Sequence, residues 1–519
     1  MKFFKNTLSF VLSAVLVLCL SNSAFALQYT EDSNLYYKNQ LLNFENGSNL
    51  IKGYEALSNA VKQMEDSVEF SKSYKLSPED LSNIINVFLW DNPWAFYFDY
   101  NFSYSYMISN NQEIVLQADL TYKMSKSEVE EAKEEIDSVV NNIMMVVDKF
   151  DNDYDKELYI HDYLALSINY IENDHAYDIY GALVLHESVC EGYAKAFQYL
   201  LAFAGIKSCM VVGQSNNPTT KLPEEHAWNL VLIDDVYTYV DVTWDDQGEA
   251  GIWYTYFNLP YSLISVDHMF YGSSFEFPTD YDLSQNYFYK KQAVVNELSV
   301  NSIVPLFKND RAVFLYLGNE SDVYSWYQNN ISNIVAGIHV SGGYSYGYVE
   351  FGYAKLMYIN WNNTATKTVS GTVSSNSARA LYLYPENIDD EIIKHDAISD
   401  TPVLKLDYEA EYSSKNFSFK NVYPGTYKAV YSYNGEVDIV SLKVENFDVT
   451  NVFLGTAAGD INADGAVDDK DVSTLRKYLA GWDVYCNKEH ADVNKDGNID
   501  DKDASHLAKY LAGWTGIEI

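Results

Sequence analysis

The sequence predicts an α+β protein built from several domains. Three observations support this prediction: helices and strands mix in the middle of the chain, short alternating strands dominate from residue 366, and an acidic loop followed by a helix occurs twice near the C-terminus. With 519 residues, the chain is long enough for several cores. The apolar content of 47% and the charged content of 21% are typical of folded protein.

The chain begins with the pattern of a secretory signal. Two lysines precede an apolar run from Leu8 to Leu20, and a small-x-small cleavage site ends at Ala26. We therefore expect a signal peptide over residues 1–26 and an exported mature protein. No later run reaches the roughly 18 apolar residues of a membrane span, so we expect no membrane partner.

Residues 27–150 are predicted to form a mixed, mostly helical N-terminal region. Helical spacing covers Ser77 to Leu89, whereas Glu113 to Tyr122 alternates like a strand. Ser127 and Glu130 have the spacing of a capping box, which predicts that a helix begins there.

Three polar groups within residues 151–295 indicate nucleophilic catalysis. Cys190 precedes a segment with helical spacing, so its thiol lies at a helix N-terminus, where unpaired N–H groups and the helix dipole stabilise a thiolate and an oxyanion. His226 and Asp241 stand at the open ends of two strands joined by a turn at Asp234-Asp235, which predicts that imidazole and carboxylate are neighbours. Together they supply a nucleophile, its base and the group that orients the base.

The flanking sequences resemble the transglutaminase-like superfamily of papain-type cysteine enzymes, in its secreted bacterial branch. The motifs that carry this resemblance are V-C-E-G-Y-A-K-A-F around Cys190, H-A-W-N from His226 and D-V-T-W-D-D from Asp241. The resemblance implies a papain-type α+β core with a nucleophile at Cys190, a general base and acid at His226 and an orienting carboxylate at Asp241. It also implies a further oxyanion donor, which the sequence does not locate.

The other cysteines and histidines have no predicted chemistry. Of the four cysteines, one lies in the signal segment, and the odd number that remains does not form a disulfide framework. Cys209 lies in an apolar segment, so we expect an inert buried thiol. We expect His161 to be a core or helix-surface residue and His186 a loop residue, and we assign no role to His268.

Two further regions separate this core from the C-terminus. Residues 296–365 mix strands with one helical stretch, which predicts an α/β appendage. Residues 366–452 contain short alternating runs and turn dipeptides such as Asn434-Gly435, which predict a small β-sandwich. The piece from Phe417 to Lys428 resembles the sandwich repeats of the carboxypeptidase regulatory domain, and we interpret this sandwich as a spacer.

An acidic loop occurs in two copies within residues 457–519. Each copy places side-chain oxygens at positions 1, 3, 5, 9 and 12, with a backbone carbonyl available at position 7 and glycine at position 6, which is the spacing of a calcium loop. The predicted ligands of the first Ca²⁺ ion are Asp460, Asn462, Asp464, Ala466, Asp468 and Asp471. Those of the second Ca²⁺ ion are Asp492, Asn494, Asp496, Asn498, Asp500 and Asp503.

Aspartate occupies position 12 in both copies, and a single helix follows each loop. This pattern resembles the type I dockerin module, which binds a cohesin domain of a cellulosome scaffoldin. The resemblance implies that the cohesin-facing residues are Asp469, Lys470, Arg476 and Lys477 in the first copy and Asp501, Lys502 and Lys509 in the second. It also implies an extracellular location on a cellulosome.

Charge and motifs together favour a secreted cysteine enzyme. The net charge of −38 argues against nucleic acid as a partner, because a polyanion repels such a surface. We expect peptide or amide hydrolysis through a Cys190 thioester, with a protein or peptide substrate and no cofactor for catalysis. Protein cross-linking by an amine acceptor and a catalytically silent binding component of the complex are the open alternatives. A glycoside hydrolase is a third alternative, which only the dockerin suggests. The sequence shows no pair of carboxylates that would form the catalytic site of such an enzyme.

Overall fold

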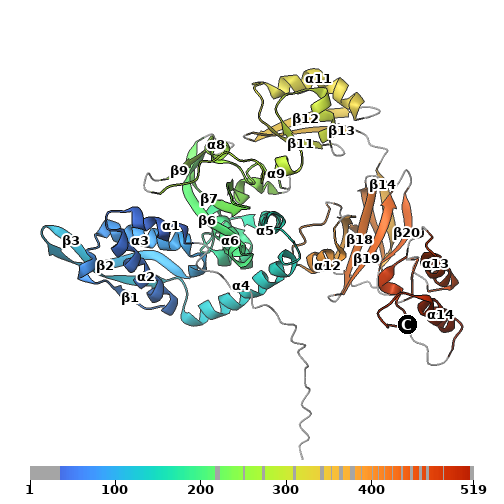
Figure 1. The fold of residues 1–519 in the computed structure, drawn as a ribbon, viewed down its shortest axis with the longest axis horizontal. Helices are drawn as coiled ribbons and strands as arrows, with labels where there is room; N and C mark the ends of the chain where they lie inside the picture. Colours follow the sequence, from blue (N-terminus) through green and yellow to red (C-terminus); the bar gives the residue numbers. More distant parts are fainter. Residues whose placement is uncertain are drawn as a thin grey trace, which may run out of the picture.

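The structure is a computed structural model that describes residues 35–514, except 217–221, 249–251, 272–274, 308–310, 339–343, 352, 362–365, 374–379, 387, 400, 407, 409, 414, 423–424, 434–435, 445–447, 455–458, 463–466, 483 and 485. The predicted signal segment 1–26, the predicted turn at Asn434-Gly435 and the predicted ligands Asp464 and Ala466 lie outside the described residues. The described part is a multidomain α+β protein, so the predicted class is confirmed (Figure 1).

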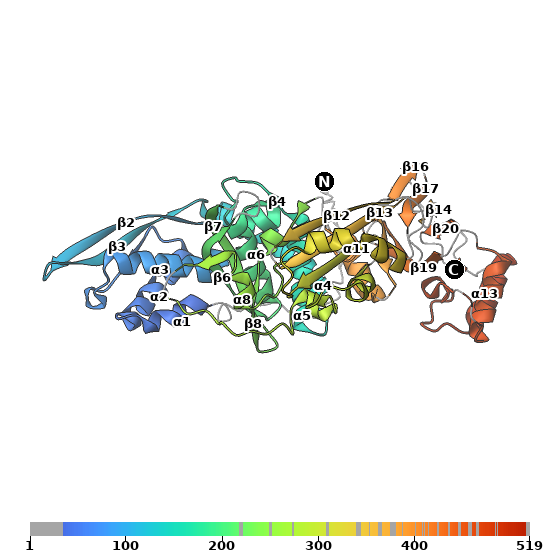
Figure 2. The ribbon, with the colours of Figure 1, turned by 90° about the horizontal axis from the view of Figure 1, so that it is seen from above.

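The N-terminal region packs helices against a three-stranded sheet of order β1-β3-β2. Its elements are α1 (Tyr36–Gln40), α2 (Gly47–Gln63), β1 (Ser67–Glu69), α3 (Pro78–Asp91), β2 (Phe98–Ser109), β3 (Gln112–Tyr122) and α4 (Lys126–Val147). Strands β2 and β3 form a long antiparallel hairpin that extends away from the rest of the molecule in both views (Figures 1 and 2). The base of this hairpin, where Phe98 pairs with Tyr122, is buried and adjoins the following domain.

Helix α4 begins earlier than predicted. The Ser125 hydroxyl accepts a hydrogen bond from the N–H of Glu128, whose carboxylate accepts from the N–H of Ser125 at 2.8 Å. The capping box is therefore Ser125–Glu128, and the prediction of Ser127–Glu130 was wrong by two residues. The segment contains two overlapping S-x-x-E patterns, and spacing alone does not distinguish them.

The next part of the chain surrounds a four-stranded antiparallel sheet of order β8-β7-β6-β9. Its elements are α5 (Asp153–Ser167), β4 (Asn169–Tyr170), a π-helical turn (Gly181–Leu185), β5 (Glu187–Ser188), α6 (Cys190–Phe203), β6 (Lys207–Asn216), β7 (Pro223–Ile233), β8 (Val236–Val240), α7 (Val242–Asp245), α8 (Tyr261–Ile264) and β9 (His268–Phe270). Helix α6 packs on β6 and β7, and most of its residues are buried. The first residue of α6 is therefore anchored to the sheet.

A second four-stranded sheet, of order β10-β11-β13-β12, shares the same continuous core. Its elements are α9 (Tyr287–Lys290), β10 (Val294–Val295), α10 (Val300–Ile303), β11 (Arg311–Tyr316), α11 (Val323–Gly337), β12 (Tyr344–Phe351) and β13 (Ala354–Trp361). Buried residues connect this sheet with the N-terminal region and the central sheet, so these parts form one large hydrophobic unit.

The following residues form two facing sheets with their own core. One sheet has the order β16-β17-β14-β20 and the other β15-β18-β19. Their elements are β14 (Lys367–Val373), β15 (Ala380–Pro385), α12 (Asp390–Ile398), β16 (Ala410–Ser413), β17 (Asn416–Val422), β18 (Gly425–Tyr433), β19 (Glu436–Val444) and β20 (Val449–Leu454). The hydroxyls of Tyr159 in α5 and Tyr384 in β15 both donate to the buried carboxylate of Asp396, at 3.2 and 2.8 Å, which connects these sheets to the central domain.

The C-terminal part contains two helices of equal length, α13 (Asp469–Leu479) and α14 (Asp501–Leu511), which pack on each other around a small core. The calcium-type loops precede these helices. Across the described residues, no helix combines the length and the apolar character needed to cross a membrane.

Candidate active site

Cys190 is the first residue of α6, and the helix start is fixed by backbone contacts. The extended Val189 precedes it with φ −114°, and the N–H of Val189 donates to the carbonyl of Ala176 at 3.0 Å. A Cβ atom on Gly192 would lie 1.9 Å from the Ser188 hydroxyl and 2.6 Å from the Ala176 carbonyl oxygen. Glycine is therefore required for this close approach, which sets where the helix and its thiol begin.

His226 and Asp241 lie side by side, as the predicted hairpin requires. His226 belongs to β7, and Asp241 directly follows β8, which pairs with β7. Oδ1 of Asp241 accepts from the N–H of Trp244 at 3.1 Å, and Oδ2 lies 2.6 Å from Nε2 of His226. Both side chains are buried, so little solvent weakens their interaction.

The electrostatics of this pair keep a proton on His226. Burial lowers the pKa of His226, but the charge of Asp241 and the hydrogen bonds to Asp241 and Cys190 outweigh this effect and raise the pKa to about 10. Burial raises the pKa of Asp241, yet the charge and hydrogen bond of His226 outweigh it and hold that pKa well below its usual range. Since Nε2 faces Asp241, Nδ1 is the ring atom left for Cys190.

His268 is a further member of this cluster, and sequence reasoning assigned it no role. Its Nε2 lies 3.0 Å from Oδ2 of Asp241, the same oxygen that faces His226, and its Nδ1 lies 2.8 Å from Oδ1 of Asp267. The Tyr256 hydroxyl donates to the other oxygen of Asp267 at 2.8 Å. Rotation of the Asp241 carboxylate would therefore break hydrogen bonds to two buried histidines and a backbone N–H.

Tyr170 approaches Cys190 from strand β4. Its phenol lies within interaction range of both the backbone N–H and the side chain of Cys190. Burial and the charge of Cys190 raise the pKa of Tyr170 to about 12, so the phenol keeps its proton at neutral pH. A phenol O–H next to a helix N-terminus can supply donors to an oxyanion.

A hollow of about 790 Å³, here called the first hollow, opens on this cluster. Its walls are residues 165–170 without 167, residues 224–226, and residues 243–248 without 245. The size lies within the range of known ligand pockets of about 300–1,000 Å³. Because His226 and Tyr170 both line it, the first hollow adjoins the residues that interact with Cys190.

The remaining predicted histidines and the buried thiol lie away from this hollow. His161 is a fully buried core residue, with Nδ1 2.9 Å from Asp162 and Nε2 3.2 Å from Asp245. His186 follows the π-helical turn in a left-handed conformation with φ 53°, so it is a loop residue. Burial raises the pKa of the Cys209 thiol well above its usual value, consistent with an inert side chain.

The spacing of His226, Asp241 and His268 would also suit a metal ion, since their ligand atoms lie within 4.8 Å of one another. In the present arrangement, however, each of these ring nitrogens faces the Asp241 oxygen at hydrogen-bond distance. The two imidazoles therefore form hydrogen bonds to one carboxylate oxygen of Asp241.

The second calcium-type loop has its ligand groups in place. The carboxylate of Asp492 accepts from the N–H groups of Asp496 and Gly497 at 3.1 and 2.8 Å, and Gly497 has φ +84° at position 6. Asp503, at position 12, is fully buried and accepts from the N–H of Asp500 at 2.9 Å. Such a set of hard oxygen ligands fits Ca²⁺.

In the first loop, the carboxylate at position 12 accepts an equivalent hydrogen bond from the N–H at position 9. The fully buried carboxylate of Asp471 accepts from the N–H groups of Ile461 and Asp468, both at 2.8 Å. The seven predicted cohesin-facing residues, Asp469, Lys470, Arg476, Lys477, Asp501, Lys502 and Lys509, are all exposed on α13 and α14.

Two family models match separate parts of this chain. Residues 144–243 match the transglutaminase-like superfamily, and residues 458–512 match the dockerin type I domain. The chain therefore carries a transglutaminase-like core and a C-terminal type I dockerin. Type I dockerin domains generally bind calcium.

Several solved structures resemble parts of the chain. A TGase is 16% identical with a TM-score of 0.20, covering 27% of this chain and 44% of that structure. A candidate cysteine protease from Cytophaga hutchinsonii is 16% identical with a TM-score of 0.19, covering 29% and 65%. A candidate protease from Parabacteroides distasonis is 9% identical with a TM-score of 0.22, covering 67% and 63%. The chain thus spans less than two thirds of each of these structures, and no curated protein matches it.

Proposed function

We propose that the protein is a secreted cysteine enzyme that hydrolyses peptide or amide bonds through a thioester on Cys190, and that its dockerin attaches it to a cohesin. The observation that carries this proposal is the buried His226, whose Nε2 lies 2.6 Å from Oδ2 of Asp241 and whose pKa is raised further by its interaction with Cys190. A thiol at a helix start, an imidazole that holds a proton and a fixed carboxylate are the parts that acyl transfer needs.

In the proposed reaction, Sγ of Cys190 attacks the carbonyl carbon of the substrate. The Tyr170 hydroxyl and the N–H groups at the start of α6 stabilise the oxyanion. His226 then donates its proton to the departing amine, the C–N bond breaks, and a thioester remains on Cys190. Water attacks the thioester while His226 takes a proton from that water, and the acid and free thiolate are regenerated.

His268 has a positioning role in this scheme. It touches neither the thiol nor the first hollow, but it shares Oδ2 of Asp241 with His226. By fixing that oxygen, it keeps the His226 ring turned with Nδ1 toward Cys190. Asp267 in turn orients His268 through a hydrogen bond to Nδ1, and the Tyr256 hydroxyl holds the Asp267 carboxylate in place.

Peptidase activity is tested by incubating the purified mature protein with a mixed peptide library and with glutamine-amide substrates. Mass spectrometry of the peptides and an ammonia assay report hydrolysis, and an added primary amine reports transamidation. The proposal fails if the protein turns over neither kind of substrate while Cys190 is intact.

Substitution Tyr170→Phe is expected to lower kcat by about 10²–10³-fold with little change in KM. The phenyl ring keeps the shape of the wall, but one donor to the oxyanion is lost, and removal of such a donor typically costs about 10²–10³ in kcat. Steady-state kinetics on one peptide measure the effect. An unchanged kcat would exclude Tyr170 as an oxyanion donor, and Tyr106→Phe, which changes an exposed phenol on the distant part of the β2–β3 hairpin, is the control.

Removal of calcium is expected to unfold the C-terminal module and to leave peptide turnover unchanged. In the second loop, Lys502 lies 3.3 Å from Asp496 and 3.1 Å from Asp500, so one lysine faces two carboxylates and the clustered acids repel one another without an ion. Differential scanning calorimetry with EDTA or Ca²⁺ should show one transition that shifts by more than about 10 °C, given the typical binding energy of calcium loops. A calcium-independent transition would contradict this assignment, and Asp501→Asn is the control for a non-ligand acid.

A further inference from the structure

A second hollow, also of about 790 Å³, lies beside the start of α6. It is bounded by the base of the β2–β3 hairpin and Lys123 on one side, and by residues 172–178 without 176 and by Glu191 and Lys195 of α6 on the other. Asn169 and Tyr170 line the first hollow, whereas Glu172 lines the second. The two hollows therefore flank one short segment that runs beside Cys190.

The second hollow is close to the reacting thiol. Glu191, which lines it, is the residue directly after Cys190, and the phenol of Tyr177 in its wall lies within electrostatic range of the Cys190 charge. An extended polypeptide whose carbonyl carbon meets Cys190 can place one side in each hollow. The N-terminal region thus supplies part of the wall around the substrate.

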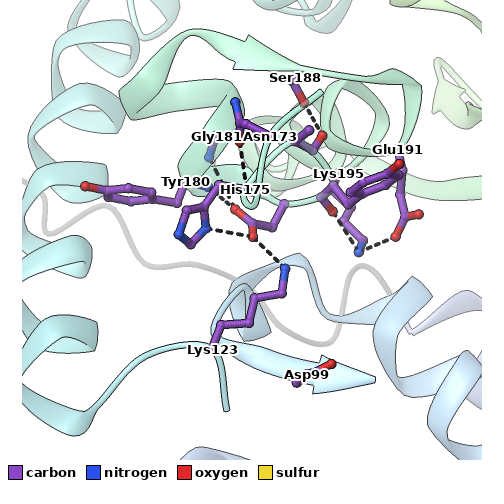
Figure 3. Close-up of polar contacts among 12 residues, drawn as sticks. Asp99, Lys123, Asn173, His175, Tyr180, Gly181, Ser188, Glu191 and Lys195 are labelled. Atoms are coloured by element: carbon purple, nitrogen blue, oxygen red, sulfur yellow. Dashed lines mark hydrogen bonds and ion pairs between the residues drawn. The ribbon is translucent and has the colours of Figure 1, made fainter. Parts of the chain in front are cut away.

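The basic side chains of this hollow are already neutralised (Figure 3). Nζ of Lys123 lies 3.0 Å from the carboxylate of Asp178, which also faces Nδ1 of His175 at 3.0 Å. Nζ of Lys195 lies 2.6 Å from Glu191. Neither lysine is therefore available to attract an acidic ligand.

Three other carboxylates face the hollow without such a partner. They belong to Asp99, Glu172 and Asp174. Within the part of the chain that the structure describes, no lysine or arginine forms an ion pair with any of them. The Tyr177 hydroxyl donates to Glu172 at 3.0 Å, and backbone and side-chain N–H groups of Asn101 donate to Asp99. These hydrogen bonds orient the carboxylates but leave their negative charge uncompensated.

The floor of the hollow is apolar and aromatic. Leu89, Phe96 and Phe98 contribute aliphatic and aromatic surface, and the rings of Tyr100 and Tyr177 are exposed by 67% and 43%. An aliphatic stem packs on such a floor, while a cation at its end meets the ring faces and the carboxylates.

We infer that the second hollow binds the lysine or arginine side chain of a polypeptide substrate, next to the bond that Cys190 attacks. This inference rests on the proposed function and adds a substrate class to it. The cation is recognised by Asp99 and Glu172, one from the N-terminal region and one from the segment beside the nucleophile. Charged groups at an exposed site contribute modestly, so the effect is a preference among peptides.

The test compares peptides that differ at one position near the cleaved bond, with lysine, uncharged norleucine or glutamate. For the wild-type protein at low salt, kcat/KM for the lysine peptide should exceed kcat/KM for the norleucine peptide about fivefold. At about 0.5 M salt this ratio of kcat/KM values should fall toward one, because salt screens exposed charges. The double variant Asp99→Asn, Glu172→Gln should lose the preference but still cleave the norleucine peptide. The variant Glu113→Gln, an exposed acid on the distant part of the hairpin, should retain the preference.

Binding to the inactive Cys190→Ala variant provides a second readout, in which the lysine peptide should bind more tightly than the norleucine peptide. Equal kcat/KM for lysine and norleucine, or a preference that survives in the double variant, would overturn the inference. The inference would also be overturned if the double substitution changed the incorporation of a free amine but left peptide cleavage unchanged. If none of the peptides is cleaved, the proposed function itself fails.

Discussion

Substitution Cys190→Ala is expected to abolish peptide turnover, with a loss of at least about 10³-fold in kcat/KM, because removal of a nucleophile leaves only the residual effect of binding and the oxyanion site. The helix start is fixed by Val189 and Gly192, so the variant should keep its fold and its melting temperature. Turnover of a single peptide, followed by mass spectrometry, measures the loss.

The matched control is Cys486→Ala in the C-terminal module, which should keep full turnover. A Cys190→Ala protein that still hydrolyses peptides at the wild-type rate would contradict the thioester mechanism. It would then favour the alternative that residues outside this cluster carry the chemistry.

Substitution Asp241→Asn is expected to lower kcat by about 10⁴-fold, the loss found when the orienting carboxylate of a comparable triad is replaced by its amide. The charge of Asp241 is the main cause that raises the pKa of His226, so the buried ring would lose its proton at neutral pH. Steady-state kinetics between about pH 5 and 9 measure the loss. His268→Gln, which removes one of two imidazole contacts to Asp241, should have a smaller effect.

The same substitution should change how stability depends on pH. The folded-state pKa of His226 is raised, so its contribution to stability is complete below the unfolded value of about 6.5 and is lost as pH rises toward about 10. The pKa of Asp241 is lowered, so its contribution is present above about 4 and is lost as pH falls further. Breaking such a buried pair typically costs about 3–5 kcal/mol.

Urea unfolding at several pH values measures this dependence. Asp241→Asn should be least stable relative to the wild type between about pH 4 and 6.5, and the difference should shrink toward about pH 10. A difference that stays constant with pH would contradict the assignment of an ion pair.

The sequence predicted those parts of the site that depend on local structure. Cys190 could be placed at a helix start because apolar spacing and the following glycine define α6, and His226 and Asp241 could be placed together because a short turn joins their strands. In the structure, Cys190 is the first residue of α6, and Nε2 of His226 lies 2.6 Å from Oδ2 of Asp241.

The parts that were missed depend on contacts between distant segments. His268 reaches Asp241 because β9 pairs with β6, and these two residues are 27 positions apart with no pattern that connects them. Tyr170 lies on β4, a strand of two residues. Such a strand is too short to be recognised by an alternation of apolar and polar residues. The N-terminal region contributes part of the wall of the second hollow because it packs on the central domain. The spacing of apolar residues along the chain does not predict such packing between distant segments.

The central claim is that His226 and Cys190 form an activated pair, and alkylation of the thiols tests it most directly. Iodoacetamide labelling of each cysteine is followed by mass spectrometry between about pH 5 and 9 for the wild type and for His226→Ala. Cys190 should react far faster than Cys209 and Cys486 well below the usual thiol pKa of about 8.5, and it should lose this advantage in the variant. If Cys190 reacts no faster than the buried Cys209, or reacts equally fast without His226, the proposed nucleophile is not activated and the catalytic account is wrong.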